Sequence, residues 1–134
     1  MGNISNKGKS NRRKGHESER FFASFFRKMG FDKCQTARYG SRMHDDAGID
    51  LIHLPLNVQI KAGKQTGMKP ENVIADIKQR ITETFPEGYP EHENPLVVIH
   101  KRHIKRGARR KEEDTLVHMS FDDFTKLLNM IKWE

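Results

Sequence analysis

The apolar residues in the first third of the chain recur three and four positions apart. Within residues 16–29 they form one face of a helix, and Gly30 follows as a stop signal: Phe21, Phe22, Phe25, Phe26 and Met29. This spacing predicts a strongly amphipathic helix of about 13 residues whose apolar face is buried.

Two more helices are predicted further along the chain. One starts near Pro70, a favourable first helical residue, and is expected to bury Val73, Ile74, Ile77 and Ile81. The other is the last predicted helix and starts near Ser120, which with Asp123 resembles a capping box. Its expected apolar face is Phe124, Leu127, Leu128 and Ile131.

Short apolar or alternating runs predict strands over residues 34–38, 49–54, 56–62, 95–100 and 115–119. Polar or proline-rich segments over residues 39–48, 85–95 and 101–111 are expected to be loops. The predicted order is therefore α-β-β-β-α-β-β-α. This order is typical of an α/β fold with a central mixed β-sheet flanked by helices.

The net charge of +7 is concentrated in two segments. Residues 1–15 hold five basic groups and no acid, residues 101–111 hold seven more, and the rest of the chain has 13 basic against 18 acidic groups. Phosphate backbones attract such clusters, because each neutralised phosphate releases condensed counterions. The pattern favours a nucleic-acid partner over ordinary solvated loops. Since residues 1–15 are almost without apolar side chains, we expect a disordered basic arm before a domain at 16–134.

Cys34 is the single cysteine, which excludes an internal disulfide and a zinc site made of cysteine pairs. A reducing compartment fits best, so the expected location is the cytoplasm, or the host-cell cytoplasm if the protein is virus-encoded. No apolar run approaches the roughly 18 residues of a membrane span, and no secretory signal is expected. We therefore expect no membrane partner.

The most informative segment for chemistry lies between Asp50 and Lys61. A tight turn near residue 55 would place Asp50 across from about Lys61, with Gln59 on the diagonal, and diagonal neighbours lie roughly 7–8 Å apart. Alternation puts Gln59 and Lys61 on one face, with Val58 and Ile60 in the core. Oxygens so placed can share a hard cation, and an ammonium beside them can stabilise phosphate charge. Edge strands often alternate in this way, so the pattern alone is weak evidence.

The first predicted helix adds a second motif. Lys14, Gly15, Glu19 and Arg20 form the pattern KG-x-x-x-ER directly before the phenylalanines. With Gly40-Ser41 in the loop, the Asp50 strand and Gln59-Ile60-Lys61, residues 14–63 resemble the archaeal-type Holliday-junction resolvases of the PD-(D/E)xK nuclease superfamily in order and spacing. Beyond residue 64 only the order of the elements agrees.

The resemblance implies a PD-(D/E)xK, restriction-endonuclease-like fold and a Mg²⁺-dependent DNA endonuclease of recombination and repair, with Mn²⁺ able to substitute. Glu19, Asp50 and Gln59 would hold the metal, Lys61 would assist the attacking water, and Ser41 would contact the scissile region. It also implies a homodimer that acts on branched DNA such as four-way junctions. The basic residues expected to contact DNA are Lys14, Arg20, Arg38, Arg42, Lys64, Lys101, Arg102, Lys105, Arg106, Arg109 and Arg110.

One position departs from the family pattern, because Gln59 stands where the family has glutamate. An amide oxygen can ligate Mg²⁺ but brings no charge, so metal affinity should fall. Asp45 or Asp46 could supply the missing charge, although both are otherwise ordinary loop acids. Glu17 is an alternative to Glu19, because the two lie at similar angles from the apolar face and either could simply serve the helix dipole.

Other interpretations stay open at this point. Ser41 in a Gly-Ser loop is a turn residue by default. His44, His100 and His103 could touch phosphate, but their spacing is not that of metal ligands. The alternative functions are a related nicking, flap or mismatch nuclease, and a nucleic-acid-binding protein that does not cleave.

Overall fold

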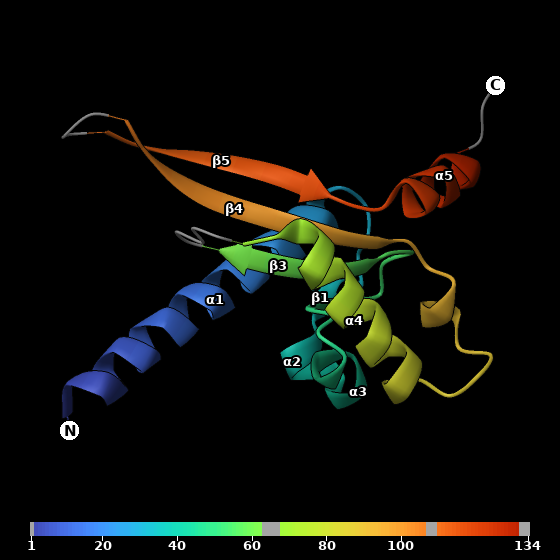
Figure 1. Cartoon of the computed structure of the whole chain (residues 1–134), viewed down its shortest axis with the longest axis horizontal. Coiled ribbons are helices and arrows are strands. Elements are labelled where there is room, and N and C mark those ends of the chain that lie inside the picture. Colours follow the sequence, from blue (N-terminus) through green and yellow to red (C-terminus); the bar gives the residue numbers. More distant parts are fainter. Residues whose placement is uncertain (1, 63–67, 107–109, 132–134) are drawn as a thin grey trace.

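The centre of the protein is a mixed β-sheet with helices on both faces (Figure 1). The computed structural model describes the backbone of residues 2–62, 68–106 and 110–131, and the side chains of residues 15–62, 68–102 and 114–131. Within these residues the sheet has five strands in the order β1-β2-β3-β4-β5.

The strands follow one another along the sheet. β1 (Gln35–Thr36), β2 (Leu51–Ile52) and β3 (Asn57–Ala62) are antiparallel, and helix α4 (Pro70–Thr84) then leads to β4 (Leu96–Arg106), which runs parallel to β3. β5 (Arg110–His118) returns antiparallel to β4. The remaining elements are α1 (Gly2–Lys28), α2 (Ala37–Gly40), α3 (Arg42–Asp46), η1 (Pro90–His92) and α5 (Phe121–Met130). The predicted α/β fold with a mixed sheet is confirmed, with short helices added inside two predicted loops.

The N-terminal segment differs from its prediction. A disordered arm was expected over residues 1–15, but helical backbone runs from Gly2 through the KG-x-x-x-ER motif to Lys28. Composition predicts disorder because the segment has little apolar surface to bury. A helix that already exists can nevertheless extend one residue at a time, and no proline interrupts residues 2–28. The helix therefore starts well before His16.

The second basic segment also differs, because residues 101–111 were predicted to be a loop. β4 instead continues to Arg106 and pairs with β5 as far as the Arg106–Arg110 partners. The backbone groups of two antiparallel strands satisfy each other whatever the charge of the side chains, and hydropathy alone does not report this. Figure 1 shows the outer part of this hairpin projecting beyond the end of β3, on the same side of the molecule as the N-terminal part of α1.

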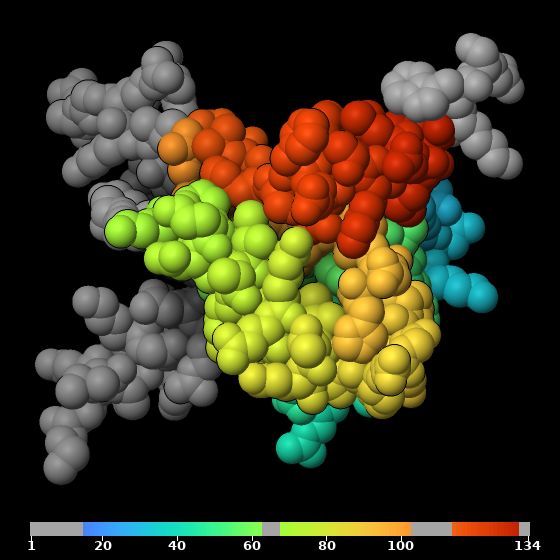
Figure 2. All heavy atoms as spheres, turned by 45° about the vertical axis from the view of Figure 1, so that its right-hand side comes forward, coloured from blue at the N-terminus to red at the C-terminus, as the bar shows by residue number. Residues whose placement is uncertain are grey.

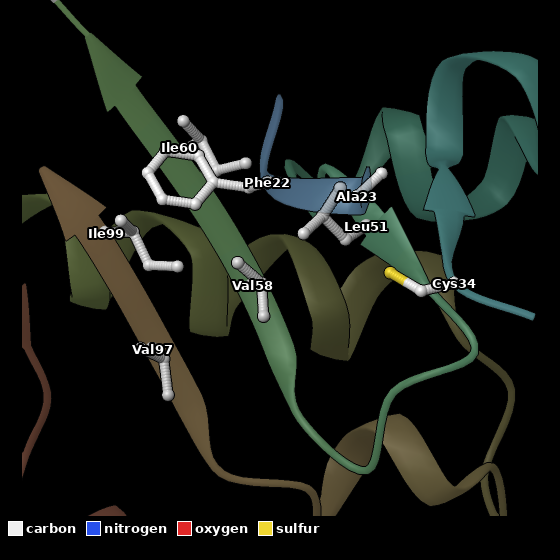
Figure 3. Packing of buried hydrophobic residues seen from close by; sticks show 8 residues of the cluster. All are labelled: Phe22, Ala23, Cys34, Leu51, Val58, Ile60, Val97 and Ile99. Carbon is white, nitrogen blue, oxygen red and sulfur yellow. The ribbon is translucent and has the colours of Figure 1, made fainter. Parts of the chain in front are cut away.

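Helix α1 covers one face of the sheet, called here the α1 face. Phe22 and Ala23 pack there with buried residues of the strands (Figure 3): Leu51, Val58, Ile60, Val97 and Ile99. The burial predicted for Val58 and Ile60 is confirmed. Not all of the predicted apolar helix face is buried, since Phe21 and Phe25 are 54% and 49% exposed. The sheet covers only part of the helix, so the outer phenylalanines remain in solvent.

Helix α4 covers the opposite face, called here the α4 face. Ile77 and Ile81 are buried against Leu96, and Val73 and Ile74 pack at the edge of this cluster. Alternation from Leu96 along β4 places His100 on the α4 face, and pairing with β4 places Gln59 and Lys61 of β3 there as well. Gln59 and Lys61 of the predicted site thus share a face with α4.

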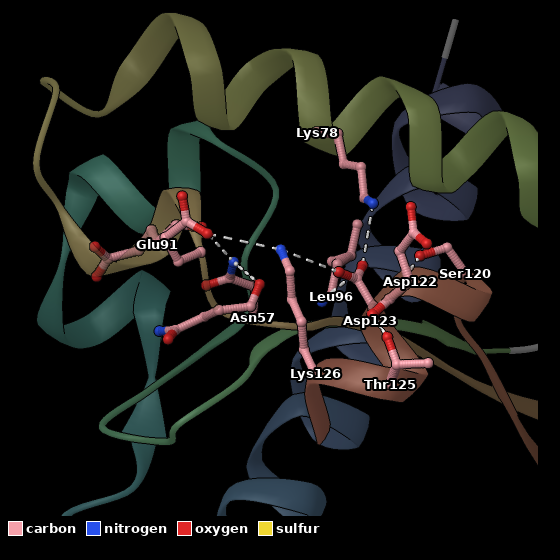
Figure 4. Close-up of polar contacts among 11 residues, drawn as sticks. Asn57, Lys78, Glu91, Leu96, Ser120, Asp122, Asp123, Thr125 and Lys126 are labelled. Atoms are coloured by element: carbon pink, nitrogen blue, oxygen red, sulfur yellow. Dashed lines mark hydrogen bonds and ion pairs between the residues drawn. The ribbon is translucent and has the colours of Figure 1, made fainter. Parts of the chain in front are cut away.

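Helix α5 is anchored by charge rather than by its predicted apolar face. Ser120 accepts a hydrogen bond from the Asp123 N–H at 3.1 Å, as the capping box predicted. Phe124 and Ile131 are 42% and 45% exposed, however, while Asp123 is 2% exposed. Its carboxylate accepts from the Leu96 N–H at 3.2 Å and lies 3.2 Å from Lys78 Nζ (Figure 4). Asp123 therefore ties α5 to both β4 and α4.

A cavity of ≈ 170 Å³ lies where α4, η1 and α5 meet. Figure 2 shows this side of the molecule hollowed between α5 and the segment around η1. Of the cations in its lining, Lys78 lies 3.2 Å from Asp123, and Lys126 lies 3.9 Å from both Asp123 and Glu93. The ion pairs of these two lysines thus help to hold α5 in place.

The role of Asp123 predicts its effect on stability. Replacing Asp123 by Ala should lower the free energy of unfolding by about 2–4 kcal/mol, because the Leu96 N–H loses its acceptor and Lys78 its partner. Ser120→Ala should cost about 1 kcal/mol by loss of the cap. Urea denaturation measures both, with exposed Asp122→Ala as the control, and equal losses for Asp122→Ala and Asp123→Ala would contradict the anchoring role.

Candidate active site

Asp50 occupies the residue just before β2 and is held to β3 by two hydrogen bonds. Its backbone N–H donates to the Val58 carbonyl at 2.7 Å, and its Oδ2 accepts from the Ile60 N–H at 2.6 Å. With Leu51 paired to Val58, these bonds place Asp50 beside residues 58–60 of β3, not opposite Lys61 as predicted. The connection occupies residues 53–56 between short strands, with His53 at φ 65°, and this shifts the register from the predicted one.

The Asp50 carboxyl is electrostatically unusual. Its pKa is raised from the ordinary value of 3.8 to about 7, mainly by burial and to a smaller extent by the negative charges of Glu19 and Asp45. The hydrogen bond from Ile60 and the charge of Lys61 act in the opposite direction. Charges from α1, α3 and β3 therefore converge on one partly buried acid.

Glu19 reaches this region from α1 and is 8% exposed, whereas Glu17 is exposed. Of the two candidate glutamates, Glu19 is thus the one at the site. Its Oε1 lies 3.2 Å from Arg38 Nη2, and this hydrogen bond raises the pKa of Arg38. Arg38 was predicted to contact DNA, but here it neutralises Glu19. No spacing rule would have paired residues 19 and 38, because the fold brings α1 and α2 together.

Gln59 and Lys61 project from β3 and are partly buried. The Gln59 amide Nε2 donates weakly to the Ile60 carbonyl at 3.4 Å, while its Oε1 is buried and has no hydrogen-bond partner among the described residues. Gly48, at φ 83°, lies alongside, and a Cβ there would sit 3.4 Å from this oxygen. The buried Gln59 Oε1 could therefore accept a hydrogen bond or ligate a cation.

The two loop acids, Asp45 and Asp46, have different surroundings in the structure. Asp45 on α3 acts electrostatically on Asp50, whereas Asp46 lies 3.8 Å from Arg42 in an exposed pair. Of these two, Asp45 is therefore the one whose charge reaches the site. Arg42, predicted to contact DNA, is paired on the surface.

Ser41 belongs to a hydrogen-bond network that the sequence did not predict. It caps α3, its Oγ lies 2.7 Å from His44 Nδ1, and His44 Nε2 lies 3.0 Å from Glu91 Oε1. The His44 ring also makes an edge contact with Phe85. These contacts join the loop after β1 to the segment around η1. They support the structural role of Ser41, and none of them links Ser41 to Asp50.

The other predicted DNA contacts have varied environments. Arg20 is exposed, Lys101 Nζ lies 4.8 Å from the Phe21 ring centroid, and Arg102 pairs with Asp114. Several predicted contacts lie outside the described residues or side chains: Lys14, Lys64, Lys105, Arg106, Arg109 and Arg110.

The candidate metal ligands are the side-chain oxygens of Asp50, Gln59 and Glu19. No group of three or more His, Cys, Asp or Glu residues in the described part of the chain is arranged to hold a metal ion. The Asp50 carboxylate and the unpartnered Gln59 Oε1 are oxygen donors of the kind Mg²⁺ prefers, and both are directed by adjacent strands. Glu19 is already held by Arg38. The donor atoms of Asp50 and Gln59 are thus of a type that suits a hard cation.

No family model, curated protein or solved structure matches the chain. Within the residues described, none of the helices is both long and apolar enough to cross a membrane.

The raised pKa of Asp50 predicts a pH dependence of stability in the metal-free protein. Between about pH 4 and pH 7 the folded state retains a proton that the unfolded state has lost, so stability should fall as pH rises through this window. Asp50→Asn should remove this contribution. The test compares urea unfolding at about pH 5 and pH 8 for the parent, Asp50→Asn and the exposed control Asp46→Asn. An identical pH dependence in parent and Asp50→Asn would refute the shift.

Proposed function

We propose that the chain is a Mg²⁺-dependent DNA endonuclease of the PD-(D/E)xK type, which hydrolyses phosphodiester bonds at Asp50, Gln59 and Lys61. The observation that carries this proposal is the convergence of the charges of Glu19, Asp45 and Lys61, from three elements, on the partly buried carboxyl group of Asp50. Perturbed acids of this kind cluster at functional sites.

The order of the elements supports the proposal. α1 carries KG-x-x-x-ER, β1 and the loop with Ser41 follow, and Asp50 and Gln59-Ile60-Lys61 then lie on or beside adjacent antiparallel strands. This is the order that the resemblance to archaeal-type resolvases implies. The α4 crossover then adds a parallel strand beside β3.

The side chains have distinct roles in the proposed site. Asp50 and Gln59 would hold Mg²⁺, which when bound polarises a phosphate and lowers the pKa of water. Lys61 places an ammonium where it stabilises negative charge on the phosphate. Glu19 adds negative charge beside Asp50 and is oriented by Arg38.

The basic segments would hold the DNA backbone. The N-terminal part of α1 and the outer β4–β5 hairpin project on the side where β3 ends, just beyond Lys61 (Figure 1). Phosphate contacts from two such arms would orient a duplex toward the site. We further propose a homodimer acting on four-way junctions, because a two-fold enzyme can cut two opposed strands of a symmetric junction.

A second candidate function is a DNA-binding protein that does not cleave. It is favoured by the neutral Gln59 and by the pairing of Glu19 with Arg38, which together leave Asp50 as the single uncommitted acid among the three proposed ligands. Cleavage assays separate the two candidates.

Plasmid DNA and a synthetic four-way junction should be cut in Mg²⁺ and not in EDTA. Lys61→Met should slow cleavage at least about 100-fold with DNA binding retained, because its charge acts on the reacting phosphate. Lys69→Met, at an exposed lysine before α4, is the matched control. Cleavage by Lys61→Met within about tenfold of the parent would remove Lys61 from the chemistry.

The same assay tests the substrate and the assembly. The protein should still bind and cut a labelled junction when unlabelled linear duplex of the same sequence is present in excess. The mass of the protein in solution should be that of a dimer. A monomer, or equal cutting of both substrates, would leave the nuclease proposal standing and reject the resolvase one.

Gln59→Glu should raise the affinity for divalent metal, because it adds a negative oxygen ligand. Calorimetry with Mn²⁺ and the Mg²⁺ midpoint of activity should both move to lower concentration. Gln79→Glu, exposed on α4, controls for overall charge. A midpoint that is unchanged, or higher, would place Gln59 outside the metal site.

A further inference from the structure

A cluster of unpartnered nitrogen atoms lies on the outer part of the sheet. His100 Nε2, Arg102 Nε and His118 Nε2 are buried and have no hydrogen-bond partner among the described residues. Buried polar atoms are nearly always satisfied by protein, water or a ligand. Three such atoms in one place therefore indicate that something else binds there.

The pairing of the strands puts all three side chains on the α4 face. His100 and Arg102 are two residues apart on β4, and His118 of β5 pairs with Val98 on that face. The rings of His100 and His118 have centroids 6.1 Å apart, and Arg102 Nη2 is hydrogen-bonded to Asp114 across the same strand pair. The three side chains thus lie close together on one face of the β4–β5 pair.

The cluster adjoins the candidate active site. His100 is the direct β-sheet partner of Lys61, in the parallel pairing of β3 with β4. Side chains of paired residues point to the same side of a sheet, so Lys61 and His100 are neighbours on the α4 face. A group bound by the cluster would lie next to the lysine assigned to the reacting phosphate.

Charge decides which kind of ligand fits. Arg102 is permanently charged, Lys61 adds a second cation beside His100, and Asp114 supplies one acid. Burial first, then the neighbouring His118 and Arg102, lower the pKa of His100, so its ring favours the neutral form that can still donate through Nε2. A metal cation would meet this positive charge, whereas an oxyanion would accept hydrogen bonds from every member.

We propose that His100, Arg102 and His118 form a subsite for a phosphate group beside Lys61. Arg102 has 38% of its side chain exposed whereas His100 is buried, so the phosphate approaches from the side of Arg102. The choice of a DNA phosphate, next to the one that is cut, rests on the proposed nuclease function. The alternative source with the same chemistry is free inorganic phosphate.

The test follows the histidine ring signals by NMR in EDTA, so that no cleavage occurs. A short DNA duplex, inorganic phosphate and, without EDTA, zinc chloride are titrated separately. The duplex should shift the His100 and His118 signals and leave His53 unchanged, because His53 lies on the exposed connection between β2 and β3. A shift with inorganic phosphate alone would identify free phosphate as the ligand and support the subsite.

Variants give a second readout. His118→Gln and Arg102→Gln should each weaken DNA binding about tenfold, since each removes a hydrogen bond to a charged group. His53→Asn is the control, because Asn tolerates positive φ. His118 and Arg102 are only partly buried, so both variants should fold, as circular dichroism will check.

The outcomes separate the subsite from the nuclease proposal. Ring shifts and weakened binding without any Mg²⁺-dependent cleavage would keep the subsite and reject the nuclease. Cleavage with unshifted rings and unchanged affinity in both variants would overturn the subsite, and so would micromolar zinc binding at these rings without any phosphate response.

Discussion

The hydrogen bond from the Ile60 N–H to Asp50 Oδ2 is the interaction on which the candidate site depends. It joins a side chain to the strand backbone at the point where β2 stops pairing with β3. The bond anchors an acid in a partly buried position, and this burial is the largest cause of its raised pKa of about 7. Without this anchor, Asp50 would turn to solvent, and neither Glu19 nor Lys61 would act on it.

The two faces of the sheet differ in polarity. The α1 face is apolar where Phe22 packs on Val58 and Ile60, and it holds the larger of the two buried apolar clusters. The α4 face is apolar only near Leu96 and becomes polar toward Lys61 and His100. A strand that alternates between these faces can therefore hold a reactive residue rigidly, because its neighbours on the other face are locked in the core.

Charge also fixes two helices in place. Asp123 is buried at the start of α5 because it satisfies the Leu96 N–H and meets Lys78. Glu19 is buried on α1 because Arg38 pairs with it. In both cases an acid occupies a place where the helical pattern would favour an apolar residue, and a partner from a distant part of the chain makes this possible.

Local patterns in the sequence determined the order of helices and strands, the apolar sides of β3 and α4, and the Ser120 cap, since these depend on neighbours within a few residues. Tertiary structure decided the rest. The hydrogen bonds of Asp50 to Val58 and Ile60 depend on the connection at residues 53–56, the extended hairpin depends on β5 pairing with β4, and the environment of Glu19 depends on Arg38. Burial and the charge of distant partners act through space, so no spacing along the chain encodes them.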